Sequence, residues 1–193
     1  MQALQSVDGR TRTAVLVEGV SDQHAVAALA ERHSRDLAAE AIAIVPIGGA
    51  QAIGRFLELY GPHGLDLRLA GLCDAGEEPD FKRALERAGF GSDLTRGDLE
   101  RLGFYVCVED LEDELIRALG AESVVEVVDA EGDLGPFRTL QKQPEWRART
   151  IEEQLRRFMG SGGRRKIRYA RLLVEALDLA DVPRPLDRLL GHV

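Results

Sequence analysis

Four short runs of apolar and β-branched residues, separated by stretches with helical character, constrain what this chain can fold into. The runs are 13–17, 41–47, 67–73 and 104–108. Helices are predicted over about 21–35, over 51–60 and from about residue 110 onward. Strands that alternate with helices at this spacing are typical of an α/β layer with a central, mainly parallel sheet of about four strands.

Beyond Gly120 the strand pattern fades. The run 124–128 is ambiguous, and its helical surroundings favour a helix. Thr150 and Glu153 form a capping-box pattern that predicts a helix over 150–158. A glycine-rich loop at 160–163 precedes a predicted helix over 166–177. We therefore expect a flexible N-terminus (1–11), an α/β core (12–120) and a helical C-terminal extension (121–193) within 193 residues.

The net charge of −8 conceals a strong asymmetry along the chain. Residues 1–130 hold 12 Lys and Arg against 24 Asp and Glu, whereas residues 131–193 hold 13 against 9. The stretch 138–171 alone holds 11 basic and 3 acidic residues. A solvated helical face is one explanation of this stretch. The contrast with the acidic remainder favours phosphate contacts along a nucleic acid.

Carboxylates follow three of the four predicted strands. Glu18 and Asp22 come after the first strand, Asp74 after the third, and Glu109, Asp110 and Glu112 after the fourth. Parallel strands end at one edge of a sheet, so these side chains should converge there. Crowded carboxylates repel one another unless a cation neutralises them, and oxygen ligands without His or Cys suit Mg²⁺ or Mn²⁺. The pattern predicts a divalent-metal site.

Simpler structural roles compete with this interpretation for individual residues. Asp22 could serve as a helix cap. Acidic residues of the predicted loop 77–80 could be solvated surface charges. Glu18 is harder to explain in this way, because a carboxylate at the end of an apolar run is partly buried and needs a partner.

The ordered motifs resemble the Toprim domain shared by topoisomerases, bacterial primases and nucleases of the overcoming lysogenization defect (OLD) family. They are Leu16-Val-Glu18-Gly19-Val-Ser-Asp22, Pro46-Ile-Gly-Gly49, Leu72-Cys-Asp74 and Glu109-Asp110-Leu111-Glu112. The last motif and the later basic helix are most similar to the OLD subgroup. The resemblance extends over roughly residues 12–180.

This resemblance implies a Toprim-type, Rossmann-like layer and metal-dependent phosphodiester chemistry. Glu18 and Asp22 match the family's first acidic motif, with Glu18 also catalytic. Asp74 matches the first aspartate of Asp-x-Asp, and Glu112 matches a later acidic ligand. Lys166 matches the catalytic C-terminal lysine of OLD nucleases, although a plain phosphate-contact or surface lysine is the alternative for it.

One position departs from the family pattern. Gly76 stands where the second aspartate of Asp-x-Asp is usual, so a metal ligand is either lost or supplied by Glu77 or Glu78. The full set of expected metal ligands is Glu18, Asp22, Asp74, Glu77, Glu109 and Glu112. The arginines expected to contact nucleic acid are Arg156, Arg157, Arg164, Arg165 and Arg168.

The predicted function is a nuclease that uses one or two Mg²⁺ or Mn²⁺ ions, with DNA favoured over RNA. The alternatives are an RNA-processing Toprim nuclease and a catalytically weak module that binds nucleic acid or a partner ATPase. OLD members commonly fuse the Toprim domain to an ATPase, and no Gly-Lys-Ser/Thr phosphate loop occurs in this sequence. We therefore expect any ATPase to be a separate partner. A homodimer would suit double-strand cleavage.

Other classes of protein fit the sequence poorly. The longest uncharged apolar stretch, 41–47, falls far short of the roughly 20 residues of a membrane span. The first ten residues lack the pattern of a secretory signal, which predicts a cytoplasmic protein. Cys73 and Cys107 show no Cys-x-x-Cys spacing, and the four histidines show no metal-ligand spacing.

Overall fold

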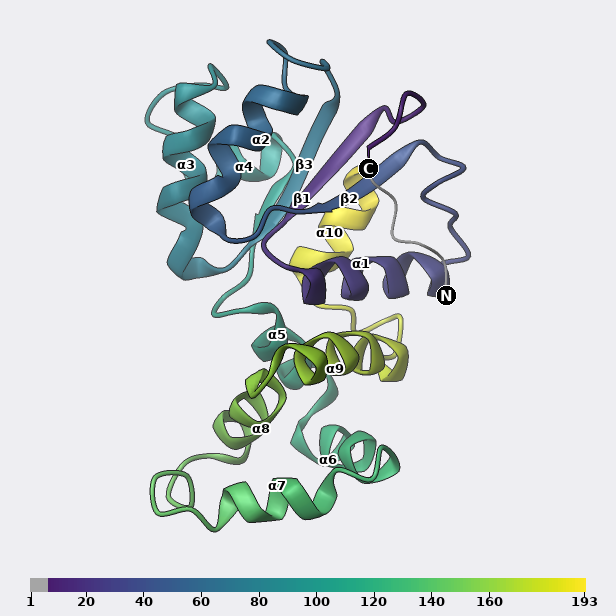
Figure 1. The fold of residues 1–193 in the computed structure, drawn as a ribbon, viewed down its shortest axis with the longest axis vertical. Coiled ribbons are helices and arrows are strands. Elements are labelled where there is room, and N and C mark those ends of the chain that lie inside the picture. The colour runs from purple at the N-terminus through teal and green to yellow at the C-terminus, as the bar shows by residue number, and fades with distance from the viewer. Residues whose placement is uncertain (1–6) are drawn as a thin grey trace.

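A computed structural model describes residues 7–193 as a sheet flanked by helices, with a further group of helices beyond one end of it (Figure 1). The sheet contains β1 (Thr13–Val17), β2 (Ile42–Pro46), β3 (Arg68–Cys73) and β4 (Phe104–Val106). Its strand order is β2-β1-β3-β4, and all neighbouring pairs are parallel. The predicted α/β fold with four strands is confirmed. The predicted flexible N-terminus lies outside the described residues over positions 1–6.

Alternate residues of each strand face opposite sides of the sheet, and each side has its own apolar core. Val15, Val17 and Leu72 lie in one core, and Ala14 and Leu16 lie in the other. Helices α1 (Val20–Arg32) and α10 (Arg184–His192) cover the first side. Helices α2 (Ile53–Tyr60), α3 (Glu78–Arg87) and α4 (Arg96–Arg101) cover the second. Both faces of the strands are therefore buried, as a parallel sheet requires.

The strand register aligns the carboxyl ends of the three longest strands. Val17 of β1 lies beside Pro46 of β2 and Leu72 of β3. The residues that follow these strands therefore emerge at one edge of the sheet.

The remaining helices form the group at that edge (Figure 1). They are α5 (Leu111–Leu119), α6 (Ala121–Ala130), α7 (Leu134–Gln141), α8 (Ile151–Gly160) and α9 (Gly163–Ala176). Phe137, Phe158 and Tyr169 stack edge to face in their centre, with ring centroids 5.3 and 6.3 Å apart. Helix α9 packs against α1, so this core is continuous with the first side of the sheet. The predicted boundary at residue 120 between the α/β core and the helical extension stays a prediction. Helix α10 belongs to the predicted extension but packs against the sheet.

Two local predictions are confirmed, and one is wrong. The run 124–128 lies in α6, and Thr150 caps α8 with Glu153 at its third position. The acidic loop predicted over 77–80 is instead a 3₁₀ turn (Ala75–Glu77) that leads directly into α3. Proline in the first turn and carboxylates near the helix N-terminus both favour a helix there. Over residues 7–193, no helix is long and apolar enough to cross a membrane.

Candidate metal centre

Carboxylates from three strand ends meet at the carboxyl edge of the sheet. Burial is the main cause that raises the pKa of Asp74 to about 8, followed by the negative charges of Glu18, Asp22, Asp110 and Glu112. Such mutual influence requires these groups to lie close together. We call these five residues and Glu77 the carboxylate cluster. The predicted convergence of Glu18, Asp22, Asp74 and Glu112 is present in the structure.

Asp22 serves the local helix and the cluster together. It lies buried in the first turn of α1, where its carboxylate accepts a hydrogen bond from the backbone N–H of Gly19 at 2.8 Å. Burial raises the pKa of Asp22 to about 6, and the charge of Glu18 also raises it. Asp22 therefore caps the helix, as the sequence suggested, through Oδ2. Its other carboxylate oxygen takes no part in this capping hydrogen bond.

Glu77 supplies a carboxylate near the position where Gly76 replaces the usual second aspartate of Asp-x-Asp. The glycine is exposed in the 3₁₀ turn after β3, whereas Glu77 reaches the cluster. Burial raises the pKa of Glu77 to about 8, and the negative charges of Glu18 and Asp22 raise it further. Glu78 points elsewhere and pairs with Lys82, at 2.6 Å, and with Arg96. Of the two candidate replacements for the missing aspartate, Glu77 lies at the cluster.

Glu112 and Lys166 form the contact between the sheet edge and α9. The ammonium of Lys166 lies 3.3 Å from Oε2 of Glu112. Burial raises the pKa of Glu112 to about 7, although the nearby ammonium opposes the rise. Burial alone would lower the pKa of Lys166, but the charges of Glu112 and Asp22 raise it above its ordinary value. The lysine is therefore held as a cation beside the cluster.

Two carboxylate oxygens in the cluster are buried without a hydrogen-bond partner in the described part of the chain. They are Oε2 of Glu77 and Oε1 of Glu112. A buried, unpaired carboxylate oxygen is costly unless a cation meets it. The donor set is oxygen alone, which suits Mg²⁺ or Mn²⁺. The residues present therefore fit a hard divalent cation, although no three His, Cys, Asp or Glu side chains within residues 7–193 are already arranged to hold one.

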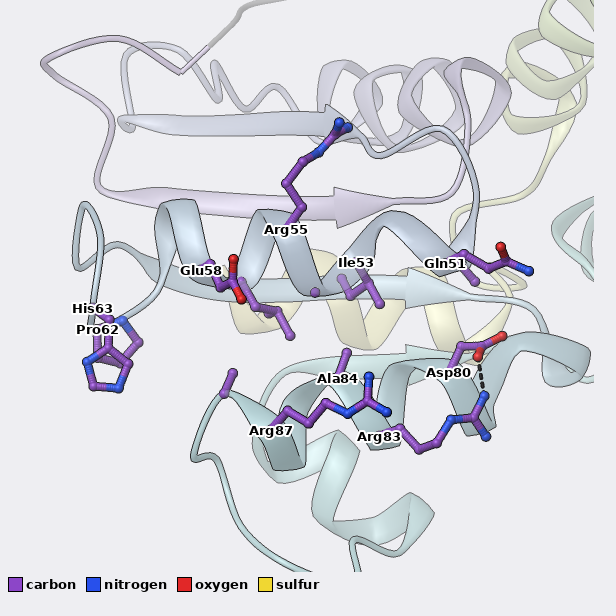
Figure 2. A pocket seen from close by; sticks show the side chains of 14 residues that line it. Gln51, Ile53, Arg55, Glu58, Pro62, His63, Asp80, Arg83, Ala84 and Arg87 are labelled. Atoms are coloured by element: carbon purple, nitrogen blue, oxygen red, sulfur yellow. Dashed lines mark hydrogen bonds and ion pairs between the residues drawn. The ribbon is translucent and has the colours of Figure 1, made fainter.

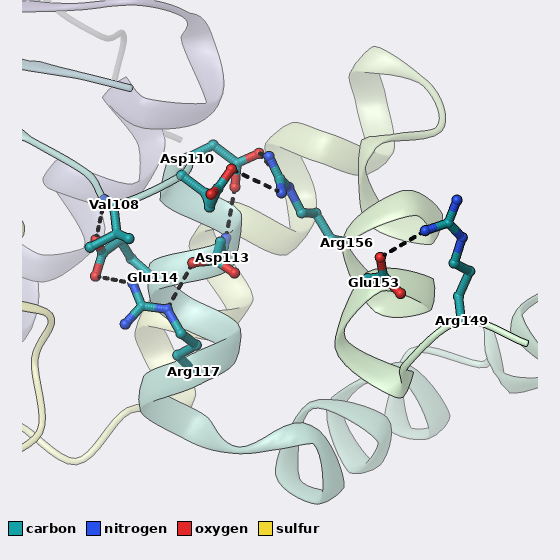
Figure 3. Close-up of polar contacts among 9 residues, drawn as sticks. Val108, Asp110, Asp113, Glu114, Arg117, Arg149, Glu153 and Arg156 are labelled. Atoms are coloured by element: carbon teal, nitrogen blue, oxygen red, sulfur yellow. Dashed lines mark hydrogen bonds and ion pairs between the residues drawn. The ribbon is translucent and has the colours of Figure 1, made fainter. Parts of the chain in front are cut away.

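Arg156 contacts Asp110, the residue of the cluster that follows β4. Its Nε donates a hydrogen bond of 2.7 Å to Oδ2 of Asp110, and its Nη2 forms an ion pair with the same oxygen at 2.6 Å (Figure 3). Oδ1 of Asp110 accepts the backbone N–H of Asp113, which caps α5. Glu114 accepts the backbone N–H of Val108 at 2.7 Å. The segment that leads to Glu112 is thus fixed from α8 on one side and from within α5 on the other.

Glu109 does not join the cluster. Its side chain is 63% exposed and lies 3.8 Å from Arg156. The neighbouring Asp110 takes its place in the cluster, and the sequence pattern that could have identified it is its position as N-cap of a helix.

Only part of the predicted arginine surface is free to meet a ligand. Arg165 and Arg168 pair with Asp133, and Arg156 pairs with Asp110. Arg164 is exposed, and within the described residues it makes no ion pair. Arg157 is exposed as well, with its guanidinium 5.8 Å from the centre of the Trp146 ring.

Comparisons with known proteins show what the sequence and the fold resemble. Residues 11–75 match the family model described as overcoming lysogenization defect protein-like, TOPRIM domain. No curated protein matches the sequence.

Solved structures match over nearly the whole chain. The C-terminal region of the Xanthomonas campestris pv. campestris OLD protein shares 26% identity with a TM-score of 0.74, covering 95% of this chain and 92% of that chain. The C-terminal region of the Burkholderia pseudomallei OLD protein shares 21% identity with a TM-score of 0.73, covering 94% and 96%. The expected resemblance is confirmed: residues 11–75 match the model of an OLD-like Toprim domain, and the chain as a whole has the fold of the C-terminal region of OLD proteins.

Proposed function

We propose that this protein is a nuclease that hydrolyses phosphodiester bonds with one or two Mg²⁺ or Mn²⁺ ions, and that its substrate is DNA. The observation that carries the proposal is the pair of unpartnered buried oxygens of Glu77 and Glu112 inside a crowded carboxylate cluster. A structural role alone gives no reason to bury these oxygens without partners. The OLD-like Toprim domain supports the same chemistry.

The residues of the carboxylate cluster have different roles in this proposal. Glu18, Asp22, Asp74, Glu77 and Glu112 would hold the metal. A bound divalent cation would supply an activated water and stabilise the leaving oxygen at phosphorus. Asp110, fixed by Arg156, keeps the β4 side of the cluster in place. Glu109 has no part in this proposal, because its side chain is exposed away from the cluster.

Lys166 provides a fixed positive charge where negative charge develops on the phosphoryl oxygens. Its ammonium lies 3.3 Å from Glu112. With a cation bound by Glu112, that ammonium would be available to a phosphate at the same edge of the sheet. Such preorganised charge at a shielded site is among the largest contributions to catalysis.

Cleavage of supercoiled plasmid in Mn²⁺ tests the proposal, with a structured RNA as a second substrate. Wild type is expected to nick or linearise the plasmid, and Glu18→Gln to slow cleavage by about 100-fold or more. Glu126→Gln is the matched control, because Glu126 is an exposed glutamate of α6 without an ion pair among residues 7–193. Intact plasmid and intact RNA with wild-type protein would overturn the nuclease assignment.

The second candidate is a catalytically weak module that binds nucleic acid. The observation in its favour is the Lys166–Glu112 ion pair, which occupies one of the expected metal ligands. Binding of DNA without cleavage in Mg²⁺ or Mn²⁺ would identify this function. Cleavage of RNA alone would identify the RNA-processing alternative. A separate ATPase partner, a homodimer and a cytoplasmic location stay predictions from the sequence.

A further inference from the structure

The loop that joins α7 to α8 projects from the helical extension, away from the sheet (Figure 1). This α7–α8 loop covers residues 142–150 and consists mainly of turns. Trp146 in its middle is half-buried, and within residues 7–193 it is not among the side chains that form or pack against either apolar core. Tryptophan is enriched at interfaces, where its large ring supplies contact area. The position of Trp146 thus suits contact with another molecule.

A buried glutamine holds the α7–α8 loop in place. Gln154 of α8 is 6% exposed, and its Nε2 donates to the carbonyl oxygens of Trp146, at 2.8 Å, and of Arg149, at 3.1 Å. Its Oε1 accepts a hydrogen bond of 2.7 Å from Nε2 of Gln141, at the end of α7. A buried amide is costly unless it is hydrogen-bonded, and here all three bonds go to the loop and its flanks. The loop therefore presents its side chains from a fixed backbone, which lowers the cost of binding.

Positive charge dominates this surface. The cations of 138–164 that are exposed and form no ion pair within residues 7–193 are Arg138, Lys142, Arg147, Arg157 and Arg164. In the same stretch, Glu145 and Glu152 are exposed without an ion pair among the described residues, whereas Glu153 pairs with Arg149 at 3.2 Å. Five such cations against two such carboxylates leave an excess of three positive charges, in a chain whose net charge is −8. A polyanion is the ligand that this excess selects.

The hollow between α2 and α3 has no such excess (Figure 2). Arg83 pairs there with Asp80, and Glu58 offsets Arg87. The guanidinium of Arg55 points away from the hollow. Of these two surfaces, the α7–α8 loop is the one whose charge suits phosphate.

Helix α8 connects the loop to the carboxylate cluster. Arg156 of this helix contacts Asp110 of the cluster (Figure 3), and the next residue, Arg157, has its guanidinium 5.8 Å from the centre of the Trp146 ring. Arg149, in the loop, precedes Arg156 by seven positions, a helical rise of about 10 Å. This rise equals about three steps of a DNA duplex at 3.4 Å each. A duplex held at the cluster therefore reaches the loop within a few base pairs.

We propose that the α7–α8 loop and Arg157 form a second DNA contact, away from the metal centre, that contributes affinity and takes no part in the chemical step. Arg147, Arg157 and Lys142 bind backbone phosphates, and Trp146 packs against the adjoining sugar. Because the loop projects from the extension, it meets a duplex without separation of the strands. Phosphates carry no sequence information, so binding here is independent of sequence. The inference rests on the proposed function for the identity of the ligand and deepens it by assigning this contact.

Fluorescence anisotropy with a labelled duplex of about 20 base pairs tests the contact, with Ca²⁺ present to neutralise the carboxylate cluster. The double variant Arg147→Ala/Arg157→Ala is expected to bind at least about tenfold more weakly. The slope of log affinity against log salt should become shallower by about 1.8, which is about 0.9 for each lost phosphate contact. Trp146→Ala should weaken binding by at least about threefold through the lost apolar contact. The double lysine variant at positions 147 and 157 should bind like wild type.

Plasmid cleavage in Mn²⁺ separates affinity from chemistry. For the double alanine variant, KM should rise by about tenfold while kcat stays within about twofold of wild type, because the contact is the same in the ground state and in the transition state.

The double variant Arg55→Ala/Arg188→Ala is the matched control. It also removes two exposed arginines that form no ion pair within residues 7–193, so it changes the net charge equally. Arg55 lies on α2 and Arg188 on α10, both outside the helical extension. The control should change affinity by less than about twofold. Thermal melting by circular dichroism verifies that each variant is folded.

Four results would overturn the inference: no binding of the duplex by wild type, binding by the double alanine variant within twofold of wild type, an equal loss in the matched control, or a lower kcat with unchanged KM. Plasmid cleavage by wild type decides the proposed function separately. Cleavage by wild type with unaltered binding by the double alanine variant would overturn the loop contact alone. Weakened binding by that variant without wild-type cleavage would support the loop contact and overturn the nuclease.

Discussion

Replacing Asp74 by Asn should stabilise the metal-free protein and remove its response to metal. In the folded state, burial and neighbouring carboxylates raise the pKa of Asp74 from 3.8 to about 8. The folded protein therefore holds the proton more tightly than the unfolded chain. Raising the pH from about 4 to about 8 then destabilises the folded state, because the unfolded chain loses the proton first. Asn has almost the same shape and removes the ionisation.

The size of the effect follows from the pKa shift. A shift of one unit corresponds to about 1.36 kcal/mol, so a fully shielded Asp74 would cost about 5–6 kcal/mol at pH 8. Asp74 is only half-buried, and solvent and salt screen its repulsion. We expect a gain of about 1–2 kcal/mol for Asp74→Asn at pH 8. In a chain of this length, that gain raises Tm by about 3–6 °C.

Thermal unfolding followed by circular dichroism measures this gain, first in EDTA at pH 8 and at pH 5. The difference in the free energy of unfolding between variant and wild type should shrink at pH 5. At that pH Asp74 in the unfolded chain is closer to its own pKa, so its ionisation there stabilises the unfolded state less. Mn²⁺ at 100 times its dissociation constant should then stabilise wild type by about 2.7 kcal/mol and leave the variant nearly unchanged. The order of the two melting temperatures should thus reverse.

Glu126→Gln serves as the control and should follow wild type in every condition. Two results would refute the reasoning. One is an Asp74→Asn variant that is no more stable than wild type at pH 8 in EDTA. The other is a metal-induced shift of the same size in both proteins.

Two further predictions concern the cations that flank the cluster. Arg156→Ala should weaken Mn²⁺ binding by about tenfold in calorimetry, because Asp110 loses its hydrogen bond and its ion pair with the guanidinium; unchanged affinity would show that Arg156 is not needed to position Asp110. Lys166→Met should slow plasmid cleavage by about 100-fold or more, because the positive charge beside the phosphate is lost. Mn²⁺ should bind at least as tightly as before, because the ammonium that competes for Glu112 is gone. Loss of metal binding in this variant would contradict a role at the phosphate.

The strands and the convergence of carboxylates could be predicted because both depend on local pattern and topology. A β-branched run such as 13–17 needs burial on both faces, and a parallel sheet supplies it. Once the strands are parallel, Glu18 and Asp74 must emerge at the same edge. Val17, the last residue of β1, pairs with Leu72 of β3, so Glu18 lies one position and Asp74 two positions beyond this pair.

The parts that could not be predicted depend on contacts between distant segments. Asp110 and Arg156 are 46 positions apart, and Asp133 and Arg168 are 35 apart. Nothing in the spacing of these residues distinguishes an arginine that pairs within the protein from one that meets phosphate. Glu77 was among the expected metal ligands, but the local structure around it was predicted wrongly, because helix α3 begins directly after the 3₁₀ turn where a loop was expected.

The arginine-rich segment contains two kinds of arginine, which its total charge does not distinguish. Some pair with carboxylates within the protein, and others are exposed. Arg165 and Arg168 pair with Asp133 inside the extension, and Arg171 pairs with Glu31 of α1 at 2.6 Å. Such partly exposed pairs contribute little stability individually. The apolar contact of α9 with α1 supplies most of the attraction between extension and sheet. This packing of α9 against α1 is therefore what places Lys166 beside Glu112.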